Sequence, residues 1–294
     1  MFTRRIIDWL DWNNRNFTNI SGLRRRQANM VKSADNNGLV RQSQFSACRI
    51  PLRQLKQPGP GEVQIWYLDL GMLGRSLQDA LSGPADNGSR PPLTIGQLRF
   101  ARRFYLKLLL GAYLGIPGKS VSLNRSIRGK PALDQSIHDG DLHFSMAKSG
   151  DRLLIGISVS SLVGVDLEPA DRRAHFALGV ARRYFSAAEA RALENIALER
   201  MDETFLRAWA CKEAVVKASG EGIANQLCRF SVEMDPDKPP AILEFENEDA
   251  AHWSLALLQP DPDFIGAVAA NNARMKVQAY QLLPAAGHST LNHS

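Results

Sequence analysis

Apolar and polar positions alternate in several short segments of the chain, and this alternation predicts strands. Two longer segments have helical spacing: residues 95–114, closed by Gly115 and Pro117, and residues 205–220, ended by a glycine. Because strands and helices are interspersed without a regular strand–helix–strand rhythm, we predict an α+β fold. The strand-like segments are residues 63–70, 143–146, 153–158, 241–245 and 253–258, with others beginning near Ala267 and Lys276.

The segment 95–114 is apolar on most sides, which predicts a largely buried helix. Arg99, Arg103 and Lys107 nevertheless form a cationic stripe along it at four-residue spacing. A buried cationic stripe is costly unless an anion meets it. The alternative is a stripe that faces solvent, and the sequence leaves both open.

The first 62 residues differ in charge from the rest of the chain. They hold eleven Lys and Arg against four Asp and Glu, whereas the whole chain of 294 residues has a net charge of +6. They end in the breaker run Gln57–Gly61. We predict a basic, poorly ordered extension over 1–62 and a disordered tail over 285–294. Binding of nucleic acid or an anionic surface by the basic extension is the alternative.

The remaining bulk properties are those of an ordinary globular protein, with 44% hydrophobic and 22% charged residues. No apolar stretch is long enough to cross a membrane, and charges interrupt the only apolar segment near the start. The three cysteines have no metal-binding spacing, which favours free thiols in a reducing compartment. We therefore expect a cytoplasmic protein without a membrane partner.

The candidate chemistry lies in two acidic motifs about fifty residues apart. Asp166 and Glu168 are two apart in a predicted strand and point to the same side. Trp209, Glu213 and Lys217 are four apart in a predicted helix and share one face. Three carboxylates and a lysine would converge if these faces meet. Hard oxygen ligands of this number suit Mg²⁺, which takes substrate phosphates as further ligands.

Each motif also has an ordinary structural interpretation. An Asp-x-Glu pair is often a solvated strand edge, and Glu followed four residues later by Lys is often a weak surface ion pair. Here, however, the apolar residues 162–165 precede the acids, so the acids would end a largely buried strand. Buried carboxylates need a partner or a metal, which favours a site.

With these residues in view, the chain resembles the Sfp-type 4′-phosphopantetheinyl transferases from about Val63 to Leu283. Two of the matching segments, residues 163–168 and 205–222, are specific when found together. The other two are shorter, and Gly-Lys-Pro alone is weak. The four segments, in order, are Gly129-Lys130-Pro131, Phe144–Gly150, Val163–Glu168 and Phe205–Gly222.

The resemblance implies two similar α+β halves, residues 63–162 and 163–284, related by a pseudo-twofold with the active site at their interface. It also implies transfer of 4′-phosphopantetheine from coenzyme A to a serine of an apo acyl, polyketide or peptidyl carrier protein, with release of 3′,5′-ADP. Mg²⁺ would be the cofactor. A monomer is expected, because one chain supplies both halves.

The resemblance also assigns roles to individual residues. Asp166, Glu168 and Glu213 would hold Mg²⁺ against the pyrophosphate, and Glu213 would be the base for the serine. Lys217 would steady the pyrophosphate and the leaving group. The residues implied in coenzyme A binding are Arg103, Lys107, Lys130, Pro131, Lys148, Ser149 and Lys212 as well as Lys217.

One position departs from the family pattern. The family usually has histidine in a Ser-His-Ser-type turn that binds phosphate, whereas this chain has Ala147-Lys148-Ser149. A lysine keeps a permanent positive charge, so we expect retained binding with less pH dependence. The alternative is a member with impaired or changed activity owing to Lys148.

Other functions remain to be weighed against the transferase. A magnesium-dependent phosphohydrolase would use the same acids but would not need the Gly-Lys-Pro segment or the phosphate-binding turn. A nucleic-acid-binding module would leave the buried acids unexplained. For an acidic carrier protein, the basic-apolar segment from Arg172 to Phe185 is a candidate surface, although an ordinary amphipathic helix fits it equally well.

Overall fold

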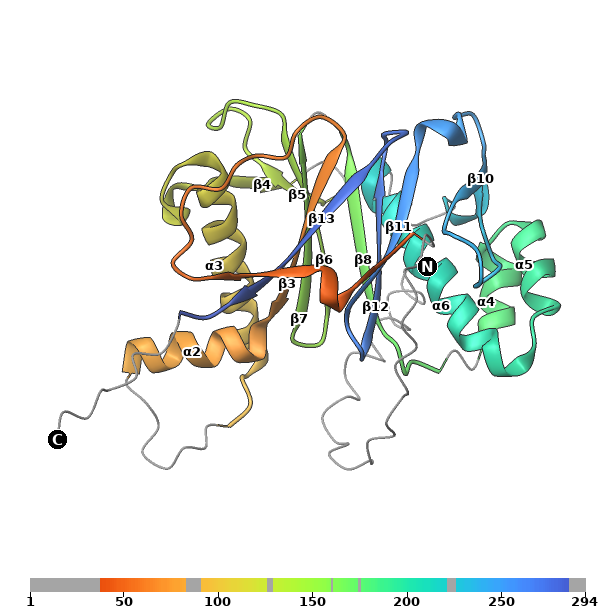
Figure 1. Cartoon of the computed structure of the whole chain (residues 1–294), viewed down its shortest axis with the longest axis horizontal. Coiled ribbons are helices and arrows are strands. Elements are labelled where there is room, and N and C mark those ends of the chain that lie inside the picture. The colour runs from red at the N-terminus through yellow and green to blue at the C-terminus, as the bar shows by residue number, and fades with distance from the viewer. Residues whose placement is uncertain are drawn as a thin grey trace.

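The computed structural model describes residues 38–82, 91–125, 129–159, 161–173, 176–220 and 226–285. Two mixed sheets lie between helices, and they confirm the α+β fold (Figure 1). Sheet A has the strand order β1–β11–β12–β8, and sheet B has the order β2–β13–β3–β7–β6. Two short ribbons pair β4 with β5 and β9 with β10.

Sheet A contains β1 (Leu39–Arg41), β11 (Ser254–Asp261), β12 (Phe264–Ala270) and β8 (Val163–Pro169). Sheet B contains β2 (Phe45–Arg49), β13 (Lys276–Leu283), β3 (Glu62–Asp69), β7 (Arg152–Val159) and β6 (Leu142–Ser149). The others are β4 (Leu123–Arg125), β5 (Pro131–Leu133), β9 (Phe230–Val232), β10 (Ile242–Phe245), α2 (Leu70–Ser82), α3 (Ile95–Leu114), α4 (Ala177–Tyr184), α5 (Ala187–Glu194) and α6 (Leu198–Ser219).

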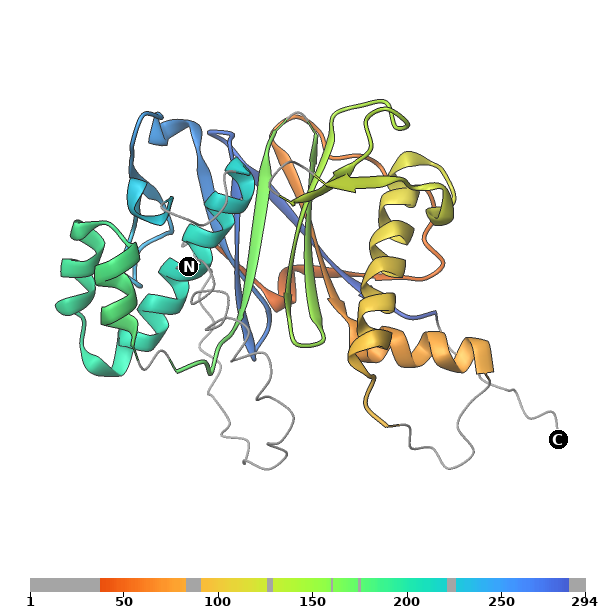
Figure 2. The same ribbon diagram turned by 180° about the vertical axis from the view of Figure 1, so that it is seen from behind.

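The core is layered, and the two views show α3 and α6 on opposite sides of the paired sheets (Figures 1 and 2). One apolar cluster packs α3 against sheet B, with Leu109 and Ile155 fully buried in it. A second cluster fills the space between the sheets and includes Ile65 and Val165. A third packs α6 against sheet A. The order of layers is therefore α3, sheet B, sheet A and α6.

The same topology occurs twice along the chain. In the first half β3 is followed by α3 and by the hairpin β6–β7, and β7 pairs antiparallel with β3. In the second half β8 is followed by α6 and by the hairpin β11–β12, and β12 pairs antiparallel with β8. This is the repeat of two α+β halves that the family resemblance implies.

The N-terminal boundary differs from the expectation of a poorly ordered extension over 1–62. β1 pairs in parallel with β11 in sheet A, and β2 pairs in parallel with β13 in sheet B. Residues 39–49 therefore join both sheets, because each exposed sheet edge offers backbone groups for pairing. Residues 1–37 and 286–294 lie outside the described residues.

Helix α3 has the predicted bounds, but it is less buried than its composition suggests. Phe100 is 61% exposed, and Arg99 and Arg103 are also exposed. The prediction of a largely buried helix is thus wrong for the face that carries Arg99, Phe100 and Arg103. The alternative interpretation, that these arginines face solvent, is correct. The inner face carries the packing, with Tyr105 and Leu109 against sheet B.

Helix α6 begins seven residues before the predicted start and ends as predicted. Gly220 closes it with a positive φ of 71°, the left-handed conformation that glycine adopts without strain. Among the described residues, no helix combines the length and apolarity that crossing a bilayer requires.

Candidate active site

Strand β8 places the first two acids beneath α6. Val163, Val165 and Leu167 face the core between the sheets, so the alternate residues Asp166 and Glu168 face α6. Gly164 on that same face allows close packing, because a Cβ there would lie 1.9 Å from the carbonyl oxygen of Ala214. The prediction that Asp166 and Glu168 share a side is confirmed.

Helix α6 brings the third acid and the lysine to this position. The Nζ of Lys217 donates to Oδ1 of Asp166 at 2.6 Å and lies 3.8 Å from Oε2 of Glu213. Arg172, four residues after Glu168, donates to Oε2 of that carboxylate. All three carboxylates are less than a tenth exposed. Two cations therefore stand among three buried acids.

Burial dominates the electrostatics of this cluster. It raises the pKa of Glu213 to about 8, with Lys217 opposing the shift and the other two acids adding to it. Burial and repulsion from Asp166 raise the pKa of Glu168 to about 7, against the effect of Arg172. For Lys217, burial lowers the pKa, but Asp166 and Glu213 outweigh it and the pKa is raised.

The donor set fits a hard divalent cation in its chemistry. Oδ2 of Asp166 and Oε1 of Glu213 are buried and have no hydrogen-bond partner among the described residues. Orphaned carboxylate oxygens of this kind are costly and suit an oxygen-seeking ion such as Mg²⁺. The described residues do not contain three acidic, histidine or cysteine side chains already arranged around one metal position. Lys217 and Arg172 take up oxygens that such an ion would use.

Lys130 approaches the acid cluster from the first half of the chain. Its Nζ donates to the carbonyl oxygens of Lys217, at 2.6 Å, and Val163, at 3.2 Å. Burial and the charge of Lys217 lower its pKa to about 8. The Gly-Lys-Pro segment is thereby tied to the C-terminal end of α6 and the start of β8, and Pro131 begins β5 directly afterwards.

Lys148 and Ser149 lie at the opposite end of β6 from His143. Lys148 is exposed and alternates with Phe144 and Met146, which pack toward α3. It therefore lies on the α3 side of sheet B, the side on which Arg103 and Lys107 are carried by α3. The structure thus divides the predicted residues into an acid-cluster group and a second group across sheet B.

Lys212 is not available to coenzyme A, in contrast to the role implied by the resemblance. Its side chain is fully buried, and its Nζ donates to both carboxylate oxygens of Glu189 at 2.7 Å and to the carbonyl oxygen of Phe230 at 2.7 Å. The ring of Phe230 lies 4.2 Å from the ammonium. Glu189 also accepts from the backbone of Val232. The pair joins α5, α6 and β9, so its role is structural.

Arg172 and Phe185, the two ends of the candidate partner surface, make contacts inside the protein. Arg172 is engaged with Glu168 inside the site, and no helical spacing could have indicated this contact because Glu168 lies in β8 and Arg172 follows that strand. Phe185 is buried and stacks on Phe205 and Trp209. Trp209 therefore has the core-packing role expected for it. Phe176, by contrast, is 72% exposed and stays available to a partner.

Comparison with known proteins finds relatives of this chain. The family model described as the 4′-phosphopantetheinyl transferase superfamily matches residues 162–270, which include all three acids and Lys217. The 4′-phosphopantetheinyl transferase psf-1 of Bacillus pumilus is 31% identical over 125 residues, 42% of this chain and 49% of that protein. A holo-(acyl-carrier-protein) synthase structure from Bacillus anthracis has 20% identity and a TM-score of 0.30, covering 37% of this chain and 93% of the synthase.

The relation extends well beyond the acid motifs in another protein. The 4′-phosphopantetheinyl transferase HetI of a Nostoc species is 30% identical over 222 residues, which are 71% of this chain and 87% of HetI. The chain therefore belongs to the 4′-phosphopantetheinyl transferase superfamily.

Proposed function

We propose that this protein transfers 4′-phosphopantetheine from coenzyme A to a serine hydroxyl of an apo carrier protein and releases 3′,5′-ADP, with Mg²⁺ as cofactor. The observation that carries the proposal is that three buried carboxylates lie close to Lys217. One oxygen of Asp166 and one of Glu213 accept no hydrogen bond from the described residues. Membership of the superfamily supports the reaction class.

Asp166, Glu168 and Glu213 would hold the magnesium. When bound, the ion supplies neutralisation of the pyrophosphate charge, which phosphoryl transfer needs more than covalent assistance. Lys217 lies between Asp166 and Glu213 and retains a partly exposed side chain. Its ammonium is placed to donate to a pyrophosphate oxygen and to stabilise the negative charge on the leaving group.

In the reaction the serine loses a proton and forms a bond to phosphorus, and one bond of the pyrophosphate breaks. Glu213 accepts the proton of the serine hydroxyl, the general-base role that a positioned carboxylate can fill. The serine oxygen forms a bond to the phosphorus that carries the pantetheine. The bond from that phosphorus to the bridging oxygen breaks, and its electron pair leaves with 3′,5′-ADP.

The adenosine end of coenzyme A would be held by residues of the first half of the chain. Lys130 and Pro131 border the acid cluster, while Lys148, Arg103 and Lys107 offer cations on the α3 side of sheet B, and Ser149 offers a hydroxyl at the end of β6. Lys148 stands where the family usually has histidine, and an ammonium there is a point charge that suits a phosphate. A Lys148→Ala change should raise the KM for coenzyme A, and an unchanged KM would remove Lys148 from the binding site.

The partner would be an acyl, polyketide or peptidyl carrier protein, met by one copy of this chain. Phe176 and the arginines near α4 offer an exposed apolar side chain beside positive charge, which suits an acidic docking helix. Because both halves of the site are in the same chain, a monomer suffices for the reaction.

Intact-mass measurement tests the function directly. An apo carrier protein is incubated with this protein, coenzyme A and Mg²⁺, and a parallel sample contains EDTA. We expect a mass increase of one phosphopantetheine on the carrier and the appearance of 3′,5′-ADP, both abolished by EDTA. Carriers of several types that keep their apo mass while coenzyme A demonstrably binds would contradict the proposal.

A further inference from the structure

The turn after β8 carries a cation back into the acid cluster. Strand β8 ends at Pro169, and the backbone N–H of Arg172 donates to the carbonyl oxygen of Pro169 at 3.2 Å, which closes the turn. The backbone N–H of Ala170 donates to the carbonyl oxygen of Asp263 at 2.8 Å and ties the turn to the hairpin of β11 and β12. Arg172 is thereby directed back toward the strand that it follows, where its guanidinium donates to Oε2 of Glu168.

This ion pair is shielded from solvent. The side chains of Arg172 and Glu168 are each 11% exposed. Their charges attract each other more strongly there than at the surface, because little water screens them. The influence of Arg172 extends to a second acid: burial raises the pKa of Glu213, and the charge of Arg172 is among the effects that oppose this rise. Arg172 is therefore a cation of the acid cluster itself and not of its rim.

A metal ion at the three acids would have to share them with this guanidinium. Asp166 and Glu213 each present one buried oxygen, Oδ2 and Oε1, that accepts no hydrogen bond from the described residues. Glu168, by contrast, has its Oε2 engaged by Arg172. Mg²⁺ needs short bonds in near-ideal octahedral geometry, and its charge repels a guanidinium on the same carboxylate. Coordination of Mg²⁺ by all three acids therefore competes with the ion pair between Arg172 and Glu168.

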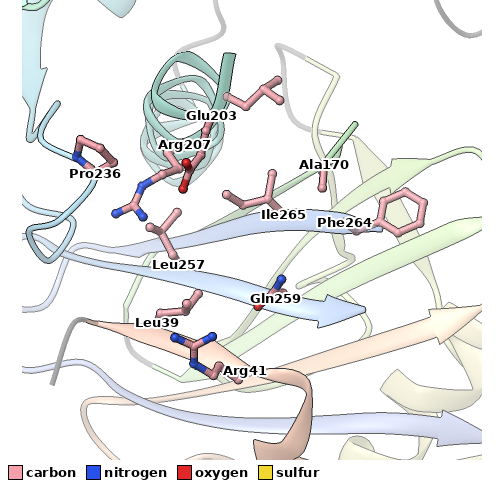
Figure 3. Close-up of a pocket in the computed structure, with 11 residues that line it drawn as sticks. Leu39, Arg41, Ala170, Glu203, Arg207, Pro236, Leu257, Gln259, Phe264 and Ile265 are labelled. Carbon is pink, nitrogen blue, oxygen red and sulfur yellow. The ribbon is translucent and has the colours of Figure 1, made fainter. Parts of the chain in front are cut away.

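Arg172 has both the space and a chemical reason to move. It lies outside the helices and strands. The turn that carries it borders a cleft of about 390 Å³ between α6 and sheet A, whose lining includes Ala170, Phe264 and Ile265 (Figure 3). A pyrophosphate at the acids would offer new acceptors, because a guanidinium binds phosphate oxygens through two parallel hydrogen bonds. The displaced cation would then exchange one anion for another.

We propose that Arg172 is a displaceable counter-ion, which holds Glu168 in the metal-free protein and moves to the pyrophosphate when Mg²⁺ and coenzyme A bind. The inference rests on the proposed function, because it requires Mg²⁺ and coenzyme A at the acids. Its consequence is a coupling between the two ligands. The free protein binds the ion weakly because Arg172 competes for Glu168, and coenzyme A strengthens the binding because its pyrophosphate accepts the displaced guanidinium.

The test uses Mn²⁺, which takes the same oxygen ligands as Mg²⁺ and whose unbound form is measured by electron paramagnetic resonance. The full-length protein is titrated at about pH 8.5, above the pKa values of about 7 for Glu168 and about 8 for Glu213, so that protons compete little with the ion. We expect Arg172→Gln to lower the Kd for Mn²⁺ alone about fivefold or more relative to the wild type. The further tightening that coenzyme A brings about should shrink by a similar factor.

Arg173→Gln is the matched control. Arg173 is the next residue in the chain and is exposed, and its replacement changes the net charge of the protein by the same amount. The Kd of this variant for Mn²⁺ should stay within about twofold of the wild-type value, since solvent screens an exposed charge. Arg172→Lys keeps a positive charge at the site and should bind Mn²⁺ more weakly than Arg172→Gln. Structural damage weakens a metal site, so tighter binding by Arg172→Gln is a result that damage does not produce.

The outcomes separate this inference from the proposed function. If Arg172→Gln binds Mn²⁺ no more tightly than the wild type, or if Arg173→Gln gains as much affinity, the role of Arg172 is overturned while the metal site stands. Absence of protein-bound Mn²⁺ in the wild type and in every variant, with and without coenzyme A, would overturn the metal site of the proposed function and this inference with it.

A measurement on the wild type does not depend on the folding of Arg172→Gln. In ¹⁵N NMR spectra of the arginine side chains, the Nε signal of Arg172 is the one missing from Arg172→Lys. This signal should shift when Mg²⁺ and coenzyme A are added together, because the guanidinium changes its partner. A signal that stays in place while both ligands bind would contradict the exchange.

Discussion

At the scale of single residues, burying three carboxylates together costs free energy, and a bound cation would offset that cost. Asp166, Glu168 and Glu213 lie where β8 meets α6, a place where burial disfavours charge. Lys217 and Arg172 offset part of that cost but leave two carboxylate oxygens without a hydrogen bond among the described residues. Because the negative charge of these acids is only partly compensated by the protein, a bound cation should stabilise the folded state.

The raised pKa values predict how stability depends on pH. Glu168 and Glu213 have pKa values of about 7 and about 8 in the folded protein, well above their usual 4.5. Between about pH 5 and pH 8 the folded state therefore binds more protons than the unfolded state, so the free energy of unfolding of the metal-free protein falls as pH rises. Mg²⁺ needs the deprotonated carboxylates and should stabilise more at high pH.

Thermal unfolding at about pH 6 and about pH 8, with and without Mg²⁺, measures this effect. We expect the increase in Tm on adding Mg²⁺ to be clearly larger at the higher pH, and to be much reduced in Glu213→Gln. An increase that is equal at both pH values, or that survives unchanged in the variant, would argue against a magnesium site at these acids.

Lys212 and Lys217 are five residues apart on α6, yet the structure gives them different roles. Lys212→Met leaves Glu189 buried without its cation, so we expect a loss of about 3–5 kcal/mol in the free energy of unfolding. The KM for coenzyme A of the folded protein should stay near that of the wild type. Lys217→Met, by contrast, should slow transfer strongly because Lys217 faces the acids.

Urea unfolding and steady-state kinetics separate the two roles. The double variant Lys212→Met/Glu189→Gln should recover part of the lost stability, because the uncompensated charge is then gone. A Lys212→Met protein of normal stability with a greatly raised KM would instead return Lys212 to the coenzyme A site.

At the scale of elements, the site depends on how closely α6 lies on β8. The tightest approach is at Gly164, where a Cβ would lie 1.9 Å from backbone oxygen and 2.4 Å from backbone nitrogen of α6. Gly164→Ala should push the helix from the strand, destabilise the protein by several kcal/mol and reduce transfer. Gly179→Ala in α4 is the matched control, since nothing lies within 4 Å of its Cβ position.

Chemical denaturation of both variants decides this point. Gly179→Ala should be neutral or stabilising by up to about 1 kcal/mol, as for an alanine in a helix. If Gly164→Ala is as stable and as active as the wild type, the helix and strand are not held at the distance that the account requires.

Among the elements, some features could be predicted from the sequence and others could not. The bounds of α3, the strand alternation at Asp166 and Glu168 and the glycine end of α6 follow local rules, so they were predictable. The burial of Lys212 could not be predicted, because its role came from the family resemblance and its contacts with Glu189 and Phe230 depend on how α5 and β9 pack on α6. β1 was missed because a three-residue strand acquires its structure from pairing with β11, a contact more than two hundred residues distant in the sequence.

At the scale of the whole molecule, the N-terminal strands hold the two sheets together. β1 adds to sheet A and β2 to sheet B within a single short segment, while β13 from the C-terminal half lies between β2 and β3. Each sheet therefore contains strands from distant parts of the chain. The two halves are consequently expected to unfold together.

Two N-terminal deletions test the role of this segment. Removal of residues 1–50 takes away β1 and β2, exposes two sheet edges and should lower the Tm markedly. Removal of residues 1–37 takes away no described residue and serves as the control, with an expected Tm near that of the full chain. Equal Tm values for both deletions would show that the strands do not stabilise the paired sheets.

We propose that Asp166, Glu168 and Glu213 form one magnesium site on which phosphopantetheine transfer depends. The most direct measurement is the initial rate of mass gain of an apo carrier protein as a function of Mg²⁺ concentration, for the wild type, Glu213→Gln and the exposed-residue control Glu199→Gln. We predict a saturable dependence on Mg²⁺ for the wild type and the control, and a rate at least about a hundredfold lower for Glu213→Gln. Transfer by Glu213→Gln at the wild-type rate, with the same dependence on Mg²⁺, would contradict the account.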